Sequence, residues 1–409
     1  MKEGNYIVGL DVGTTKICTL VTRADAEGME ILGVGTTQSQ GLRKGMIVDM
    51  EGASEAIRES LQKAEESSGI EIKNVYAGIS NGHIKSNARS GAVGITSGIV
   101  RQSDIDRAME SARSVYVPLD KEVMHIIPVE YVVDGECKIN NPVGMRAMRL
   151  EANVQVITVG SNAVHNLARC CEMAGVMVAG VQLSPLVSAM AVLREDEKQY
   201  GAILIDIGGG TADIAMFKND NFLSTAIIDV GGNQFTNDIA VGLRIPVEEA
   251  ERLKKAYGMA MHSYASDSDE ITISGSNKEG RKILRSLMTD VIMPRADELL
   301  RLIREEIRNM SGYEMAPCGV VLTGGVSQLR GFVTLAQQVL SMPVRVGMPE
   351  GKAIIDKIKS PIYSTSVGLA MYGQKNQNES SIDVISGEFG SMKKWLKEVV
   401  VKVFRSNRN

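Results

Sequence analysis

One stretch of the sequence decides the fold: Ala202-Ile203-Leu204-Ile205-Asp206-Ile207-Gly208-Gly209-Gly210-Thr211-Ala212-Asp213-Ile214-Ala215-Met216-Phe217. An apolar run ends at Asp206, three glycines and Thr211 follow, and a second apolar run begins at Ala212. The pattern predicts two buried strands joined by a tight glycine turn. Such a turn lets backbone N–H groups approach a ligand closely, and the carboxylate at the strand end can hold a hydrated Mg²⁺. By itself, however, a glycine turn is more often a plain hairpin.

The same pattern occurs near the start of the chain, in Leu10-Asp11-Val12-Gly13-Thr14-Thr15-Lys16. An apolar strand again ends at an aspartate, and a second strand again follows the turn. Two copies about half a chain apart are typical of a duplicated fold whose halves face each other. Two such turns could clamp opposite sides of one polyphosphate–Mg²⁺ group, and Lys16 would add a cation for the phosphates.

A third glycine turn follows the apolar run Gly319–Thr323 and contains Gly324 and Gly325. We expect it to open a helix from Gln328 to about Leu340. A turn between a strand and a helix lets a flat base or a ribose lie on the backbone near the helix N-terminus. Strand–turn–helix units are common, so this turn alone does not establish a nucleotide site.

The composition is that of an ordinary globular protein. The chain has 409 residues, of which 44% are apolar and 23% are charged, which is enough for two or three domains. No run of about 20 apolar residues is found, so no membrane span is expected, and Met1–Asn5 contains no apolar signal region. The five cysteines lack metal-ligand spacing and fit buried thiols in a reducing cytosol. The P-loop and Rossmann motifs are also absent, which argues against those two classes of nucleotide site.

The last 19 residues differ in charge from the rest of the chain. They carry six basic side chains and one acid, a net charge of +5, whereas the whole chain carries −4, which leaves −9 for the remainder. The acidic remainder argues against nucleic-acid binding, and the basic end is suited to an anionic surface.

Residues 374–390 have the composition of a flexible linker. Apolar residues then recur at helical spacing with lysines mainly opposite, although Val401 blurs the division. The pattern predicts an amphipathic helix on a membrane surface, and a helix packed on the body is the alternative. The apolar face and the flanking cations are Trp395, Leu396, Val399, Val400, Val403 and Phe404 with Lys393, Lys394 and Lys397.

Between the glycine turns, strands and helices follow one another in an α/β pattern. We expect residues 83–158 to form a small inserted domain with one helix and several strands, and Val154–Val159 to return to the main sheet. Helices are expected from Lys278 to Met310 with an interruption near Pro294.

The three turns in this order and at these spacings resemble the phosphate-1, phosphate-2 and adenosine motifs of the actin/Hsp70/sugar-kinase superfamily. Within it, the chain resembles the bacterial cell-division family FtsA over essentially its whole length. The matching segments are Asp11–Lys16, Gly41–Asp49, Ile205–Thr211, Glu248–Gly258 and the tail.

The resemblance implies a duplicated α/β, actin-like ATPase fold with an inserted small α+β domain and a C-terminal amphipathic helix. The inserted domain replaces actin's small domain at a different place. The implied divisions are subdomain 1A at 1–82, 159–200 and 365–373, inserted subdomain 1C at 83–158, subdomain 2A at 201–230 and 306–364, subdomain 2B at 231–305, a linker at 374–390, and the membrane-targeting helix at 391–409.

The resemblance also implies ATP and Mg²⁺ as cofactors. Asp11 and Asp206 would hold the metal through water, and Glu251 and Lys254 match positions that touch the ribose in actin-like relatives. The phosphates and the adenosine would be held by Gly13, Thr14, Thr15, Lys16, Gly208, Gly209, Gly210 and Thr211, and by Gly324, Gly325 and Val326, respectively.

The family resemblance implies partners as well. It predicts a head-to-tail polymer of the chain itself, placed on the cytoplasmic face of the cell membrane at the division site, that tethers filaments of the tubulin-like protein FtsZ. The FtsZ C-terminal tail would bind the segment 231–305, with Arg285 and Arg295 as contacts. Other division proteins would bind through the inserted domain.

One position departs from the superfamily pattern. Many members carry Glu or Gln, often before a proline, to orient the attacking water, whereas this chain has Ser184 before Pro185. Without that carboxylate, water activation should be poorer. We therefore expect ATP binding with at most slow hydrolysis and leave the catalytic residue unassigned; Asp213 or Gln182 could substitute.

Other classes remain as alternatives. A different actin-like ATPase, such as a shape-determining filament or a pilus-assembly protein, would not be expected to combine the inserted domain with a linker and terminal helix. A small-molecule kinase would need a catalytic acid, for which no clear candidate is found. An Hsp70-type chaperone is disfavoured because no substrate-binding domain follows the ATPase body.

Overall fold

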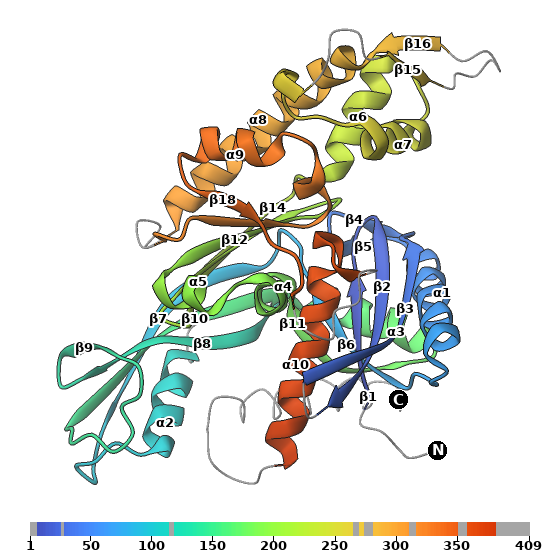
Figure 1. Ribbon diagram of the computed structural model, residues 1–409. Helices are drawn as coiled ribbons and strands as arrows, with labels where there is room; N and C mark the ends of the chain where they lie inside the picture. The colour runs from blue at the N-terminus through green and yellow to red at the C-terminus, as the bar shows by residue number, and fades with distance from the viewer. Residues whose placement is uncertain are drawn as a thin grey trace. The chain divides into compact units, whose positions relative to one another are not determined.

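The computed structural model, drawn in Figure 1, describes residues 6–25, 28–113, 118–264, 270–273, 281–310, 316–350 and 358–381. The chain divides into two units. The first comprises Met1–Ile84 and Ala163–Gln374, and the second comprises Lys85–Asn162 and Lys375–Asn409. The second unit therefore interrupts the first between Ile84 and Ala163.

The first unit contains two five-stranded sheets that share one topology. In each, a hairpin and a third antiparallel strand come first in sequence, and two later strands add in parallel beside the first strand. In sheet order, the first has β3 (Gly28–Gln38), β2 (Lys16–Asp25), β1 (Tyr6–Val12), β6 (Asn74–Ile79) and β11 (Met177–Leu183), and the second has β14 (Asn221–Ile228), β13 (Ala212–Lys218), β12 (Ala202–Ile207), β17 (Val320–Thr323) and β18 (Val344–Val346). This repeated order confirms the predicted duplication.

Helices and short strands complete the first unit. The helix α1 shows how local sequence sets its ends: Asp49 caps its N-terminus by accepting a hydrogen bond from the Glu51 N–H, and Gly69 ends it with φ of 70°. The remaining elements are α1 (Met50–Ser68), α3 (Ser161–Met173), α4 (Ser184–Val192), α5 (Glu195–Tyr200), α6 (Gly232–Leu243), α7 (Val247–Tyr257), α8 (Arg285–Asn309), α9 (Phe332–Leu340) and α10 (Ser364–Ser381), the strand pairs β4 (Leu42–Arg43) with β5 (Met46–Ile47) and β15 (Glu270–Ile273) with β16 (Arg281–Leu284), and the 3₁₀ turns η1 (His262–Tyr264), η3 (Gly325–Gln328) and η5 (Pro361–Tyr363).

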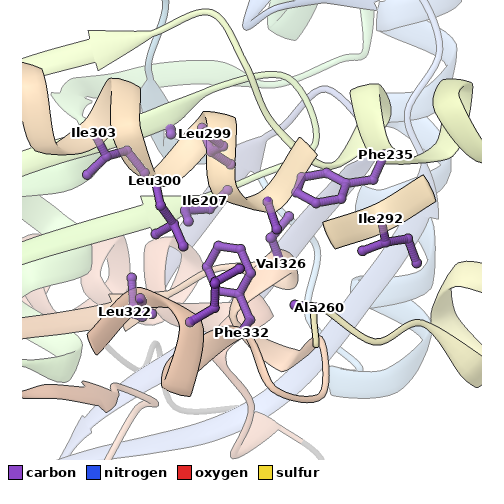
Figure 2. Packing of buried hydrophobic residues seen from close by; sticks show 14 of the residues in the cluster. Ile207, Phe235, Ala260, Ile292, Leu299, Leu300, Ile303, Leu322, Val326 and Phe332 are labelled. Carbon is purple, nitrogen blue, oxygen red and sulfur yellow. The ribbon is translucent and has the colours of Figure 1, made fainter. Parts of the chain in front are cut away.

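A hydrophobic core joins the second sheet to α6, α8 and α9, and Figure 2 shows part of it. Phe235 of α6 and Phe332 of α9 are fully buried in this core, with Val326 of η3 labelled between them. Full burial of such side chains stabilises the fold by about 1.5–3 kcal/mol each. The third glycine turn is therefore anchored, through Val326, in the core of this half of the unit.

The second unit is built on the antiparallel sheet β7–β10–β8–β9. Its helix α2 buries Ile105, Ala108 and Ala112 in a core that includes residues of β10. Its elements are β7 (Lys85–Gly94), α2 (Gln102–Arg113), β8 (Lys121–Val133), β9 (Glu136–Ile139) and β10 (Arg149–Gly160). The expectation that Val154–Val159 returns to the main sheet is wrong, because β10 pairs with β7 and β8 along its whole length. An apolar run does not itself specify which sheet it joins.

Two helix predictions are also corrected. The helix α8 continues through Pro294 without the expected interruption, because Ile292, Ala296, Leu299 and Leu300 bury a continuous apolar face around it. Burial of that face offsets a proline cost of about 3 kcal/mol. The predicted helix from Gln328 starts later, since the turn η3 ends at Gln328 and α9 begins only at Phe332, after Gly331 with φ of 82°.

Candidate functional site

The first glycine turn joins β1 to β2. Asp11 and Cys18 are paired across the hairpin, and the Gly13 N–H donates to the Lys16 carbonyl over 3.0 Å. The Thr14 hydroxyl oxygen accepts a hydrogen bond from the Gly45 N–H at 3.0 Å. The turn thus places one carboxylate and two threonines at one sheet end.

The second turn joins β12 to β13 in the same manner. Asp206 is paired with Asp213, and the Gly208 N–H donates to the Thr211 carbonyl over 2.9 Å. The carbonyls of Gly208 and Gly209 accept hydrogen bonds from the N–H groups of Gly232 and Asn233, each at 2.8 Å. The N-terminus of α6 therefore lies directly on this turn.

The two turns are in contact with each other. A β-carbon added at Gly209 would lie 2.2 Å from Thr15 Cγ2, and one added at Gly210 would lie 2.5 Å from Thr14 Oγ1. Real β-carbons do not approach other atoms this closely, so only glycine allows the approach. The structure thus brings together the residues that the sequence predicted to clamp one polyphosphate.

The third turn lies against the second. A β-carbon added at Gly324, whose φ is 81°, would lie 2.5 Å from Asp206 Oδ1. Val326 Cγ2 is 3.3 Å from the β-carbon position of Gly232, which starts α6. Gly325 opens the turn η3 beside η5, where its nearest neighbour is Ile362.

Glu251 and Lys254 of α7 lie at the start of α6. The Lys254 ammonium is 2.6 Å from Glu251 Oε2 and donates to the Gly232 carbonyl at 2.9 Å and to Thr236 Oγ1 at 2.7 Å. Burial raises the pKa of Glu251, but Lys254, Thr236 and Lys255 together hold that pKa below its ordinary value. Burial lowers the pKa of Lys254 in spite of the same pair. An ion pair therefore borders the second and third turns.

Three aspartates are concentrated where the turns meet. Asp206 is 9% exposed and accepts hydrogen bonds from Ser188 Oγ at 2.9 Å and Thr365 Oγ1 at 3.4 Å. Asp213 is 5% exposed and accepts from Ser80 Oγ at 2.6 Å. Asp11 lies 3.9 Å from the Lys16 ammonium, which also donates to the Ile362 carbonyl and faces the Tyr363 ring at 4.7 Å.

Burial controls the protonation of these acids. It raises the pKa of Asp11, with an opposing effect of Lys16. It raises the pKa of Asp206 to about 6 and that of Asp213 to about 7, and the neighbouring carboxylates add to both shifts. Carboxylate oxygens are hard ligands of the kind that Mg²⁺ prefers, and a cation would favour their charged form. The three aspartates therefore fit a hydrated Mg²⁺.

Several residues at this site had no recognisable sequence signal. Ser80 follows the carboxyl end of β6, a usual place for ligand-binding residues in α/β sheets. Ser188 and Thr365 lie in α4 and α10, where nothing in the local pattern distinguishes them. Ser184, the residue before Pro185, begins α4 and is buried, so this position contributes no carboxylate to the site.

The residues predicted to contact a partner or the membrane do not belong to the three turns. Arg295 is bound to Asp238, with Nε 2.6 Å and Nη2 3.2 Å from its two carboxylate oxygens. Arg285 donates to the Tyr257 carbonyl at 3.0 Å and lies over that ring at 5.8 Å. The predicted membrane residues between Lys393 and Phe404 lie outside the described residues. Among the helices that the structure describes, none is long and apolar enough to cross a membrane.

Known structures share this architecture. A PilM–PilN type IV pilus biogenesis complex superimposes with a TM-score of 0.65 at 18% identity, covering 90% of this chain and 98% of that one. MreB5 of Spiroplasma citri bound to ADP gives 0.58 at 14% identity, covering 93% and 99%. Together with the duplicated sheets and paired turns, this similarity defines the chain as an actin-like protein.

Sequence relatives specify the family. A model described as cell division protein FtsA matches residues 203–368, and one described as the SHS2 domain inserted in FtsA matches residues 81–158. The FtsA of Pseudomonas aeruginosa is 40% identical over 95% of this chain and 94% of its own length. Those of Bacillus subtilis and Escherichia coli K12 are 36% and 34% identical, covering 92% and 97% of this chain and 85% and 97% of their own. The chain belongs to the FtsA family of cell-division proteins, as the sequence predicted, and has an actin-like cell-division role.

The buried acids make stability depend on pH. Folding raises the pKa of Asp213 from 3.8 to about 7, so the folded protein binds more protons than the unfolded chain between these values. The free energy of unfolding should therefore fall as pH rises from about 4 to about 7, by up to about 1.4 kcal/mol per pH unit for this proton. We expect the free energy of unfolding of ligand-free Asp213→Asn, measured by urea denaturation, to fall less steeply with pH than that of the wild type. Asp220→Asn, in the exposed turn after β13, should keep the wild-type slope; an equally steep Asp213→Asn profile would contradict the assignment.

Proposed function

We propose that this protein binds ATP with Mg²⁺ where the three turns meet, polymerises on the cytoplasmic face of the cell membrane, and tethers FtsZ filaments there at the division site. The observation that carries the proposal is the direct packing of two Asp–Gly turns against each other, with the third turn on Asp206. Each turn alone is compatible with a hairpin, but their convergence provides donors, hydroxyls and carboxylates around one position.

The contacts suggest how the nucleotide would lie. The N–H groups and hydroxyls of the first two turns, with Lys16, would hold the phosphates, while Asp11 and Asp206 would hold the hydrated metal. The N-terminus of α6 lies on the second turn and adds a favourable dipole for an anion. The third turn would hold adenosine, and Glu251 and Lys254 would face the ribose. The MreB5 structure that shares the fold has ADP bound.

Hydrolysis would be slow. The residue at the start of α4 is Ser184, which cannot accept the proton of an attacking water as a carboxylate does. Asp213 is buried and already accepts a hydrogen bond from Ser80, which occupies part of its capacity to accept protons. The nucleotide would thus act mainly by binding and would control assembly.

The membrane anchor would be the helix at 391–409. A short amphipathic helix with four lysines is a weak anchor, since each lysine near an anionic leaflet adds about 1 kcal/mol. A head-to-tail polymer would present many such helices, and avidity would make the attachment firm. Polymerisation and membrane binding would therefore depend on each other.

The FtsZ tail would bind the segment 231–305. Exposed apolar side chains are found there on α6, on α7 and where β16 meets α8, together with basic residues. The apolar residues are Val241, Val247, Leu284 and Leu287. An acidic tail peptide with apolar side chains would match this composition, with Arg285 and Arg295 as contacts; further division proteins would bind the inserted domain.

The metal role of Asp206 is tested by calorimetry. Asp206→Ala should weaken Mg-ATP binding at least tenfold, or about 1.4 kcal/mol, because it removes a carboxylate that orders the hydrated metal. Its effect should be much smaller when ATP is titrated in EDTA. Asp196→Ala, at an exposed position of α5, is the matched control. Equal Mg-ATP affinity of Asp206→Ala and wild type would remove this residue from the site.

The anchor is tested by co-sedimentation with anionic liposomes, with and without ATP and purified FtsZ. Trp395→Glu should abolish pelleting of the protein and of FtsZ with it, because it puts a charge into the apolar face. Val401→Glu adds the same charge on the opposite face of the helix, so this variant should pellet far better than Trp395→Glu. Undiminished pelleting of Trp395→Glu would reject the anchor, whereas a protein that pellets without recruiting FtsZ would reject the tether.

The partner surface is tested with a labelled FtsZ C-terminal tail peptide. Arg285→Glu should weaken binding at least fivefold by fluorescence anisotropy, because it replaces an attractive charge by a repulsive one, and the difference should shrink at high salt. Arg301→Glu, on an exposed part of α8, should bind like wild type. Thermal unfolding of both variants controls for the loss of the Arg285–Tyr257 contact, and equal affinities would exclude Arg285 from the interface.

A further inference from the structure

The small hairpin of β4 and β5 has an unusual tip. Leu42 is paired with Ile47 and Arg43 with Met46, which leaves Lys44 and Gly45 as the two central residues. Both have positive φ, 50° and 71°, so this is a type I′ turn geometry. Asparagine, aspartate or glycine is the usual first residue of such a turn, whereas a left-handed lysine is strained. Strain of this kind is often retained where a side chain is needed.

The hairpin tip lies against both phosphate turns. The Gly45 N–H donates to Thr14 Oγ1 of the first turn at 3.0 Å. On the second turn, a β-carbon added at Gly210 would lie 2.9 Å from the α-carbon of Lys44. One added at Gly45 would lie 1.8 Å from the carbonyl oxygen of Ser80, the residue whose hydroxyl binds Asp213. The tip is therefore held on three sides, by the Thr14 hydroxyl and by the backbones of Gly210 and Ser80.

The second turn has two ends with different neighbours. The carbonyls of Gly208 and Gly209 accept hydrogen bonds from the start of α6, beside Lys254 and the third turn. Gly210, at the other end, lies against the backbone of Lys44. If adenosine lies by the third turn, as proposed above, the phosphate chain runs from Gly208 toward Gly210, and Lys44 stands beside its far end.

The chemistry at this end suits an anion. A hydroxyl has one donor hydrogen and two acceptor lone pairs. Since Thr14 accepts from Gly45, its own hydrogen remains directed elsewhere and can be donated to a phosphate oxygen. The lysine ammonium is a compact charge on a flexible stem and commonly binds phosphate as a point charge.

We propose that Lys44 is a further phosphate-binding residue, which contacts the terminal phosphate of a bound nucleoside triphosphate and makes the hairpin tip distinguish ATP from ADP. The inference rests on the proposed nucleotide site and adds the segment 42–47 to the two phosphate turns that would hold the phosphates. A diphosphate would leave the Lys44 ammonium without its anion, while the contacts of the two phosphate turns would persist.

Equilibrium binding of Mg-ATP and Mg-ADP by calorimetry tests this. Lys44→Gly removes the ammonium and suits the positive φ, so the hairpin and the thermal unfolding midpoint should be kept. We expect it to weaken ATP binding about tenfold and ADP binding less than twofold. Lys44→Arg should restore most of the preference for ATP. Arg43→Ala, which removes a cation from the adjacent exposed position of the same hairpin, should bind both nucleotides like wild type.

The outcomes separate this inference from the function it rests on. A Lys44→Gly protein with the wild-type ratio of ATP to ADP affinity overturns it, and so does an equal loss for both nucleotides, which would indicate a structural role of the tip. In both cases, wild-type binding of Mg-ATP leaves the nucleotide site intact. Wild-type protein that binds neither nucleotide overturns the proposed site and this inference together.

Discussion

The contact between two glycine turns is the constraint on which the arrangement of the site depends. Gly209 and Gly210 approach Thr15 and Thr14 so closely that a single added carbon would overlap them. The partners in this contact join strands of different sheets, so the glycines on one side and the threonine side chains on the other set how near the two strand ends come. Side-chain packing cannot produce so short an approach, because every other residue brings a β-carbon with it.

The same approach creates an electrostatic problem. It brings the buried Asp206 and Asp213 together with the partly buried Asp11, and burial disfavours the charged form of a carboxylate. Hydroxyls of Ser188, Thr365 and Ser80 satisfy part of the hydrogen-bonding need, but they supply no positive charge. Neutral acids at low pH, or a cation at neutral pH, relieve the repulsion. A divalent cation would offset this repulsion, which supports the proposal that the nucleotide binds together with a metal ion.

Sequence patterns predicted the parts of this site that lie within one hairpin. The acid, the glycines and the hydroxyls of each turn are contiguous, so Asp11–Lys16 and Asp206–Thr211 could be found by reading along the chain, and their repetition gave the duplicated fold. The residues that were missed, Ser80, Ser188 and Thr365, reach the acids through tertiary contacts from elements with no distinguishing pattern. The sheet of β10 was wrongly assigned for a related reason, since alternation specifies a strand and not its neighbours. Pro294 was misleading because burial of α8 outweighs a local helix-breaking preference.

The residues around the acids favour binding over turnover. A general base must be near the attacking water and must be free to accept its proton. Ser184 has no basic group, and Asp213, whose pKa burial raises to about 7, already accepts a hydrogen bond from Ser80. If the site holds a nucleotide and turns it over slowly, as proposed, the nucleotide would influence assembly only through contacts that depend on what is bound. The tip of the β4–β5 hairpin meets this requirement, because it touches both turns and the end of β6, and the hairpin leads directly through exposed Val48 to the cap of α1.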